Sequence, residues 1–188
     1  MLVGVLAVQG AFREHREALA KLGVATKEIR HRSDLDEHVD GLIFPGGEST
    51  AMGKLLHELQ LFTPLQKLIK SGTPVLGTCA GMILLAGHIE GTRFPHLGTM
   101  DICVKRNAYG RQLGSFNTKA AFGNVGQIEM IFIRAPYISQ VSSSKVEILA
   151  EVDGHMVAAR QGNQLVTAFH PELSNDMRIH SYFVEMLG

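Results

Sequence analysis

A cysteine stands between two glycines in the segment GTCAG, residues 77–81. An apolar run that predicts a buried strand leads into it, and a second apolar run, which suits a helix, follows. This pattern is typical of a nucleophile elbow, a tight turn that exposes its central side chain and requires small neighbours. The N-terminus of the following helix favours the thiolate form of Cys79. A buried structural cysteine explains the pattern about as well, because free cysteine is among the most buried residue types.

A thiol nucleophile needs a base, and His170 is the best candidate among the nine histidines. It follows the strand-like segment LVTAF, so it too is expected at the end of a strand. Glu172 lies two residues further on, and a carboxylate within reach fixes the tautomer and orientation of an imidazole. HPE alone is equally well explained as a turn with an exposed acid. Beside an elbow cysteine, it predicts a triad of Cys79, His170 and Glu172.

The remaining histidines and the second cysteine are interpreted as structural or solvated residues. Cys103 lies in a strand-like run and is expected to pack in the core. Charge-rich surroundings predict solvent exposure for four histidines: His15, His31, His38 and His57. Another four have no acidic partner at a suggestive spacing: His88, His96, His155 and His180.

The segment FPGGEST, residues 44–50, follows a third strand-like run. Its two glycines leave backbone N–H groups free to face an anion, as an oxyanion hole requires. Ser49 is expected to cap the helix that follows. A plain turn and a phosphate loop are the alternatives, although the Walker pattern is absent because no Gly-Lys-Ser/Thr follows.

These segments need a scaffold, and the hydrophobic pattern predicts strands that alternate with helices in the first half. That alternation indicates a parallel sheet covered on both faces. The strands are expected at residues 2–8, 25–29, 41–44 and 75–77, and the helices at 13–22, 55–61, 64–70 and 82–86. Short strand-like runs dominate the second half, at 101–105, 129–133, 146–151, 156–160 and 164–169, before a closing helix at 177–187.

Composition limits the class of protein. The 188 residues suit one α/β domain, with 45% hydrophobic and 19% charged residues. Lys+Arg and Asp+Glu both number 18, which argues against nucleic acid or a membrane surface as a partner. Two cysteines are too few for a disulfide framework and lack zinc-site spacing, so we expect no metal and a cytoplasmic location. We also expect no leader and no membrane span.

The three motifs PGGEST, GTCAGM and FHPEL, in this order, resemble those of the class I (triad) glutamine amidotransferases. Four further segments narrow the resemblance to the glutaminase subunits of two-component pyridoxal 5′-phosphate synthases: GVLAVQGAFREH, RNAYGRQLGSF, FIRAP and HPELSNDMRIHSYF. The match extends over nearly the whole chain. It implies a three-layer α/β/α flavodoxin-like fold, with a mostly parallel central sheet and a β-rich second half, formed by residues 1–188 as a single domain.

The resemblance also assigns roles to individual residues. It implies that Cys79 attacks the carboxamide of L-glutamine, that His170 transfers protons and that Glu172 orients His170. Backbone N–H groups of Gly47 and Ala80 would form the oxyanion hole. The residues that match the glutamine-binding segments are Gly47, Glu48, Ser49, Arg106, Ile133 and Arg134. Either arginine suits a carboxylate clamp, and either is equally well explained as a surface residue.

In this family, ammonia passes to a partner synthase subunit with an α/β-barrel fold in a hetero-oligomer. Gln9 and Gly10 match a segment involved in that interface and in activation, although Gln9 also suits an ordinary polar residue at a strand end. The resemblance implies no cofactor in this chain.

Three other functions remain as alternatives. The first is the glutaminase of a different amidotransferase, such as the one that supplies histidine biosynthesis. The second is a redox-sensing or chaperone-like protein that uses an elbow cysteine. The third alternative is a non-catalytic binding subunit. The segments at residues 9–10 and 106–112 argue against the first, and the complete set of Cys79, His170 and Glu172 argues against the other two.

Overall fold

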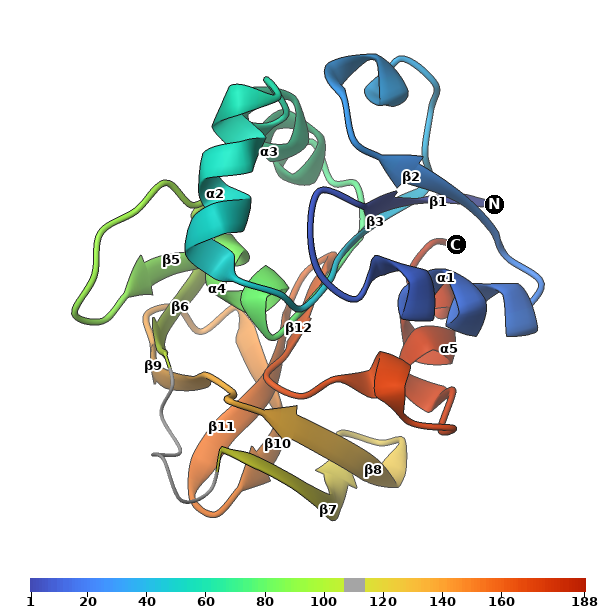
Figure 1. The fold of residues 1–188 in the computed structure, drawn as a ribbon. Coiled ribbons are helices and arrows are strands. Elements are labelled where there is room, and N and C mark those ends of the chain that lie inside the picture. Colours follow the sequence, from blue (N-terminus) through green and yellow to red (C-terminus); the bar gives the residue numbers. More distant parts are fainter. Residues whose placement is uncertain (107–113) are drawn as a thin grey trace.

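A ten-stranded sheet runs through the computed structural model, which describes residues 1–106 and 114–188 (Figure 1). Its strand order is β2-β1-β3-β4-β12-β11-β9-β6-β5, and β10 pairs with β11 outside this path. The strands β1, β2, β3, β4 and β12 pair in parallel, and their bounds are Leu2–Leu6, Ala25–Ile29, Gly41–Phe44, Val75–Thr78 and Gln164–Thr167. Because parallel strands end at the same edge, the loops after β1, β3, β4 and β12 meet there.

Helices cover both faces of this parallel part, so the three-layer arrangement that the sequence predicted is confirmed. Helices α1 and α5 lie on one face, and α2, α3 and α4 lie on the other (Figure 1). Their bounds are Phe12–Lys21 for α1, Ser49–Glu58 for α2, Phe62–Lys70 for α3, Ala80–Leu85 for α4 and Arg178–Glu185 for α5. The central strands β3 and β4 are buried on both faces, which explains their continuous apolar runs.

The second half of the chain is rich in strands, as expected. Antiparallel pairing joins β11 to β12, β10 and β9, and β9 to β6. A separate antiparallel hairpin of β7 (Ser115–Phe122) and β8 (Gly126–Ile133) lies beside the sheet. The other elements are η1 (Arg32–Leu35), β5 (Ala86–Ile89), β6 (Met100–Lys105), β9 (Tyr137–Val141), β10 (Val146–Val152), β11 (His155–Gln161) and η2 (Pro171–Leu173).

Two predictions for single residues of α2 and β6 are wrong. Glu48, not Ser49, caps α2: its carboxylate accepts hydrogen bonds from the N–H groups of Thr50 and Ala51 at 3.1 and 2.7 Å. Ser49 is instead the first residue of the helix and is buried. Cys103 is half-buried rather than part of the core, because alternation along β6 buries its neighbours Ile102 and Val104.

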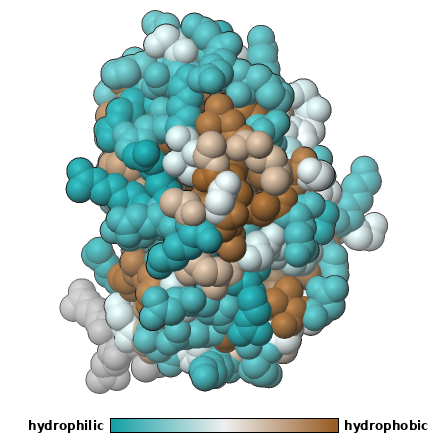
Figure 2. Space-filling model, turned by 90° about the vertical axis from the view of Figure 1, so that its right-hand side faces the viewer, coloured by the Kyte–Doolittle hydropathy of each residue, from teal (hydrophilic) through white to brown (hydrophobic). Residues whose placement is uncertain are grey.

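The surface is mostly hydrophilic on the side that Figure 2 turns to the viewer, with an apolar patch near its middle and smaller apolar groups lower in the view. None of the helices in the described part of the chain is long and apolar enough to cross a membrane.

Candidate active site

The turn at Cys79 has the strained geometry of an elbow. Cys79 connects β4 to α4 and has a φ of 47°, in the left-handed region that side chains other than glycine rarely adopt. A Cβ on Gly81 would collide with the carbonyl oxygen of Phe44, so α4 crosses β3 at a distance that only glycine permits. At Gly77, an added Cβ would lie 2.7 Å from Leu85 and 2.9 Å from the backbone of Gly81. Both glycines of the GTCAG segment are therefore required by packing.

His170 and Glu172 follow β12, the strand next to β4 in the sheet. The Nδ1 atom of His170 lies 2.7 Å from Oε1 of Glu172, and both residues are more than nine-tenths buried. The backbone N–H of His170 donates to the carbonyl of Ile131 on β8 at 2.8 Å, which fixes the start of η2 against the hairpin. The structure thus brings together the three residues that the sequence grouped as a triad.

The surroundings of His170 favour a protonated imidazole. Burial alone lowers its pKa, but hydrogen bonds to Cys79 and Glu172, together with their charges, raise the pKa to about 10. Burial raises the pKa of the Glu172 carboxyl, but nearby His15 and the hydrogen bond from His170 outweigh it and hold that pKa below its usual value. His170 is therefore a strongly basic imidazole, which keeps its proton once it has taken one from the neighbouring sulfur atom.

Loops after β1 and β3 pack backbone to backbone beside Cys79. Gly10 has a φ of 95°, and a Cβ on it would collide with the carbonyl oxygen of Gly46. The side-chain carbonyl of Gln9 accepts a hydrogen bond from the backbone N–H of Glu48 at 2.7 Å. It also lies against the α-carbon of Gly47, where a Cβ would displace it. The conformation of residues 45–48, the PGGE loop, therefore depends on Gln9.

A cavity of about 360 Å³ opens at this edge of the sheet. Two apolar residues that the sequence analysis did not select, Ile83 and Pro136, form part of its wall. Nothing in the sequence distinguishes them from ordinary core or turn residues. The predicted site residues in the lining are Gln9, Gly47, Glu48, Ser49, Cys79, Arg106, Ile133, Arg134 and His170. Gly10, Ala80 and Glu172 do not belong to it.

Neighbouring residues fix the side chain of Arg106 and the backbone of Arg134. Arg106 donates to Thr50 Oγ1 at 3.1 Å and to Glu48 Oε1 at 3.3 Å, so its guanidinium stands at the N-terminus of α2. Arg134 has a φ of 44°, a strained conformation for a residue with a side chain, and its backbone N–H donates to the carbonyl of Gly114. The geometry places two arginine side chains in the cavity wall, where either can bind a carboxylate. The sequence had left open whether each arginine is a carboxylate clamp or a surface residue.

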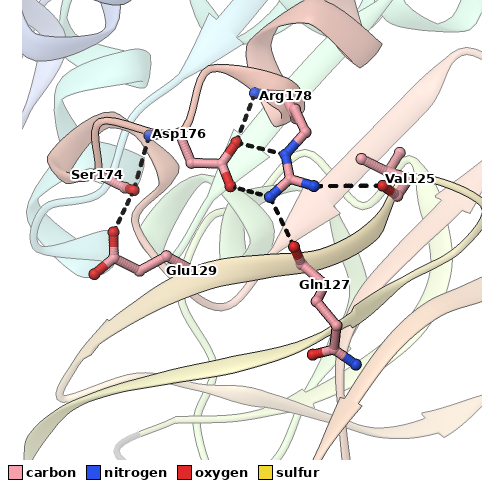
Figure 3. Close-up of polar contacts among 6 residues, drawn as sticks. All are labelled: Val125, Gln127, Glu129, Ser174, Asp176 and Arg178. Carbon is pink, nitrogen blue, oxygen red and sulfur yellow. Dashed lines mark hydrogen bonds and ion pairs between the residues drawn. The ribbon is translucent and has the colours of Figure 1, made fainter.

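A polar network fixes the hairpin that carries Arg134 to the segment that carries His170 (Figure 3). Ser174 Oγ donates to Glu129 Oε2 on β8 at 2.8 Å. Arg178 donates to the carbonyl of Gln127 at 2.7 Å and to that of Val125 at 3.5 Å, and it forms an ion pair with Asp176 at 2.6 Å. Contacts outside the cavity thus connect the hairpin on one side of the cavity to the segment after His170 on the other side.

One histidine contradicts the sequence analysis, and a second lies beside it. His15 was expected at the surface but is fully buried, and its Nε2 atom lies 3.4 Å from Glu172 Oε2. His180, for which no acidic partner was apparent, is also fully buried and lies 3.0 Å from His15. Helical spacing was the available signal, because His15 precedes buried Ala18 and Leu19 by three and four residues. The exposed positions predicted for His31, His38 and His57 are confirmed.

Comparison with known proteins gives the family. The model of the SNO glutamine amidotransferase family matches residues 5–188. The chain belongs to this family. Members of similar sequence include two curated proteins named pyridoxal 5′-phosphate synthase subunit PdxT. The one from Methanocorpusculum labreanum is 62% identical, over 100% of this chain and 98% of the relative, and the one from Haemophilus influenzae is 54% identical, over 99% and 98%.

Solved structures confirm the amidotransferase fold. A crystal structure of a glutamine amidotransferase is 45% identical to this chain, with a TM-score of 0.94 over 99% of this chain and 98% of that one. The structure of PurLQS from Thermotoga maritima shares only the fold, with a TM-score of 0.70 at 13% identity, over 100% of this chain and 98% of that one.

Part of the segment that pointed to one branch of the glutamine amidotransferase family, residues 107–112, lies outside the described residues. Within residues 1–106 and 114–188, no group of three or more His, Cys, Asp or Glu side chains is arranged to hold a metal ion.

Proposed function

We propose that residues 1–188 form a single glutaminase domain, the subunit of a pyridoxal 5′-phosphate synthase that hydrolyses L-glutamine to L-glutamate and ammonia. The observation that carries this proposal is the imidazole of His170, hydrogen-bonded to both Cys79 and Glu172 at the wall of a cavity. The names of the similar relatives support the same function.

In the first half of the reaction, His170 takes the thiol proton of Cys79, and the sulfur attacks the carboxamide carbon of glutamine. The negative charge that develops on the amide oxygen is received by the backbone N–H groups of Gly47 and Ala80. Ala80 is the first residue of α4, and a helix provides no internal acceptor for the N–H groups of its first turn. The C–N bond then breaks, and the imidazolium gives its proton to the departing nitrogen, which leaves as ammonia.

The second half removes the γ-glutamyl thioester. Water enters the position that ammonia has left, and His170 takes a proton from it as it attacks the thioester carbon. The C–S bond breaks, glutamate leaves, and Cys79 regains its proton from His170. Glu172 keeps the imidazole in one tautomer during both halves, since its carboxylate accepts from Nδ1 and leaves Nε2 for proton transfer.

The cavity wall provides the groups that a free amino acid requires. Arg106 or Arg134 binds the α-carboxylate, because a guanidinium matches a carboxylate with two parallel hydrogen bonds. Gly47, Glu48, Ser49 and Ile133 complete the glutamine site. The volume of about 360 Å³ suits a single amino acid.

The ammonia passes to the partner synthase subunit, an α/β barrel, within a hetero-oligomer. Gln9 and Gly10 form part of that interface in this proposal. Because Gln9 holds the N–H of Glu48 and lies against Gly47, a partner that contacts this loop acts directly on the proposed oxyanion hole.

Substitution of the nucleophile tests the proposal. We expect Cys79→Ala to reduce glutamate release from glutamine to background while the variant still folds, because no other group in the site forms the thioester. Enzymatic detection of glutamate measures this, and circular dichroism checks the fold. Cys103→Ala is the matched control and retains activity, because Cys103 lies outside the cavity lining. Substantial glutamate release by purified Cys79→Ala would refute the assignment.

A further inference from the structure

A buried polar cluster lies behind Glu172, on the side away from His170. It joins His15 on α1, Thr78 at the end of β4 and His180 on α5, all with no exposed surface. His15 Nδ1 lies 3.0 Å from His180 Nε2. His15 Nε2 lies 3.2 Å from Thr78 Oγ1 and 3.4 Å from Glu172 Oε2. Three separate elements thus contribute side chains that the proposed reaction does not use to one buried group behind Glu172.

Both histidines of the cluster are neutral near pH 7. Burial lowers the pKa of His15 against the opposing charge of Glu172, and nearby His170 lowers it further. Burial likewise lowers the pKa of His180, to about 3. Glu14 is the remaining charged group that acts on His15. Each imidazole therefore has one N–H and one bare nitrogen, and its tautomer decides which side donates.

Only one arrangement of these protons suits the carboxylate. If His15 carries its proton on Nε2, this N–H faces Glu172 Oε2 and Thr78 Oγ1, while Nδ1 accepts from the Nε2–H of His180. The Nδ1 atom of His180, which has no hydrogen-bond partner in the part of the chain that the structure describes, is then a bare acceptor. The opposite arrangement would direct a nitrogen lone pair at the carboxylate and bury an unpaired N–H group, which is costly.

We propose that His15 is a positioning residue for the triad: its Nε2–H holds Oε2 of Glu172, and His180 fixes the tautomer of His15. Oε2 is buried and has no hydrogen-bond partner among the described residues, and the Nε2 atom of His15 lies 3.4 Å from it. With this oxygen held from behind, Oε1 points at Nδ1 of His170 at 2.7 Å. His180 then donates to His15, and His15 donates to Oε2 of Glu172. His170 donates to Oε1 from the opposite side, so the hydrogen bonds converge on the carboxylate. The effect on turnover rests on the proposed glutaminase function, whereas the proton arrangement does not.

The proton arrangement can be measured on the wild-type chain. Two-bond nitrogen–proton NMR correlations of the ¹⁵N-histidine-labelled protein distinguish Nδ1–H from Nε2–H imidazoles. We expect His15 and His180 both to be neutral Nε2–H tautomers at pH 7. An Nδ1–H tautomer for either residue would reverse the hydrogen bond between the two histidines and remove the donor that faces Oε2. This result would overturn the proposal, whatever the protein does to glutamine.

Two variants of His15 test the consequence for the triad. His15→Leu removes the donor, and we expect kcat to fall about 10- to 100-fold, with KM changed by no more than about twofold, as for a lost hydrogen bond to a charged group. His15→Gln keeps an N–H at the same reach, and kcat stays within about threefold of wild type. Leu19→Ala, at a fully buried position one turn along α1, is the packing control and leaves kcat unchanged.

An activity-free measurement separates the two proposals. In a Cys103→Ser background, the rate of alkylation of Cys79 by iodoacetamide is followed against pH. His15→Leu should move the midpoint upward by about one pH unit, while His15→Gln and Leu19→Ala should not. If the wild-type chain releases no glutamate and His15→Leu still shifts the alkylation midpoint, the glutaminase function fails and the positioning role stands. If His15→Leu leaves both the midpoint and kcat unchanged, or if Leu19→Ala reproduces its effects, the positioning role is wrong.

Discussion

Gly46 determines where the imidazole of His170 can lie. A Cβ on Gly46 would collide with Cε1 of His170 and would lie 2.9 Å from its Nδ1. The ring therefore packs directly on the α-carbon of the first glycine after Pro45. The second glycine of this pair, Gly47, faces Gln9 instead, so the two glycines of the PGGE loop have different packing roles.

We expect Gly46→Ala to reduce kcat by about 10²-fold, because a shift of about 1 Å in a reacting group has an effect of this size. Steady-state glutaminase kinetics measure the loss, and urea unfolding shows how much of it reflects instability. Wild-type kcat in Gly46→Ala would mean that the imidazole tolerates displacement, which would contradict the close packing described here.

The sequence revealed the residues whose chemistry is visible in a motif and missed those whose role depends on contacts between distant segments. Cys79, His170 and Glu172 each stand at the end of a strand-like run, so their meeting could be inferred. His15 is 157 positions from Glu172 in the numbering of the chain, and no local pattern announces that the two lie 3.4 Å apart. The sequence analysis considered Gly46 because its backbone N–H could face an anion, and it did not foresee that the imidazole of His170 packs on this glycine.

Among the elements, the β7–β8 hairpin depends on side chains that follow η2. Arg178 connects two backbone carbonyls of the hairpin to Asp176, so it acts as a brace between the segment after His170 and the base of β8 (Figure 3). The far end of β8 carries Ile133 and is followed by Arg134, both in the cavity wall.

We expect Arg178→Ala to raise KM for glutamine several-fold, with a smaller effect on kcat. The substitution frees the hairpin that carries part of the cavity wall, whereas the contacts that position Cys79 and His170 remain. Arg32→Ala is the matched control, since Arg32 forms an exposed ion pair with Asp36 at 2.9 Å on η1 and does not line the cavity. Equal KM values for the two variants would show that the brace does not affect the substrate site.

The contact between α1 and α5 predicts a loss of stability in acid. The pKa of His180 is lowered to about 3 in the folded chain, against 6.5 for an ordinary histidine. Between these values the unfolded chain binds one more proton, so this stabilising contribution is complete above pH 6.5 and is lost as the pH falls towards 3. In His180→Phe, the slope of the unfolding free energy against pH should decrease by about 1.4 kcal/mol per unit below pH 6.5.

Urea titrations of wild type and His180→Phe between pH 5 and 8 measure this slope. Leu19→Ala is the control, because it removes a buried side chain that binds no proton and should leave the slope unchanged. A slope in His180→Phe equal to that of wild type would mean that His180 takes up no proton on unfolding in this range.

Element boundaries were predicted well where the hydrophobic pattern was clear and poorly where turn residues interrupt it. The strands of the parallel part were placed within two residues. Helix α2 was expected at 55–61 but spans Ser49–Glu58, because the polar start of the helix resembles the preceding loop. The strands β5, β7 and β9 were not anticipated, since two of them begin within or next to other apolar runs and β7 alternates mainly exposed and half-buried residues.

Over the whole molecule, the parallel sheet explains why distant motifs form one site. Loops after four parallel strands meet at one edge, and they contribute Gln9, Gly47, Cys79 and His170 to the same cavity. The fold class followed from the alternation of strands and helices, and it is confirmed. What the sequence could not provide is the depth of that cavity, because its far wall comes from a hairpin outside the main sheet.

The most direct test of the proposed function is glutamate release from glutamine by this chain, alone and mixed with a pyridoxal 5′-phosphate synthase subunit. We predict strong stimulation by the synthase subunit, lost in Cys79→Ala and weakened in Gln9→Ala, because Gln9 connects the proposed interface to the loop beside Cys79. Equal release with and without the synthase subunit, or none in either case, would contradict the proposed function.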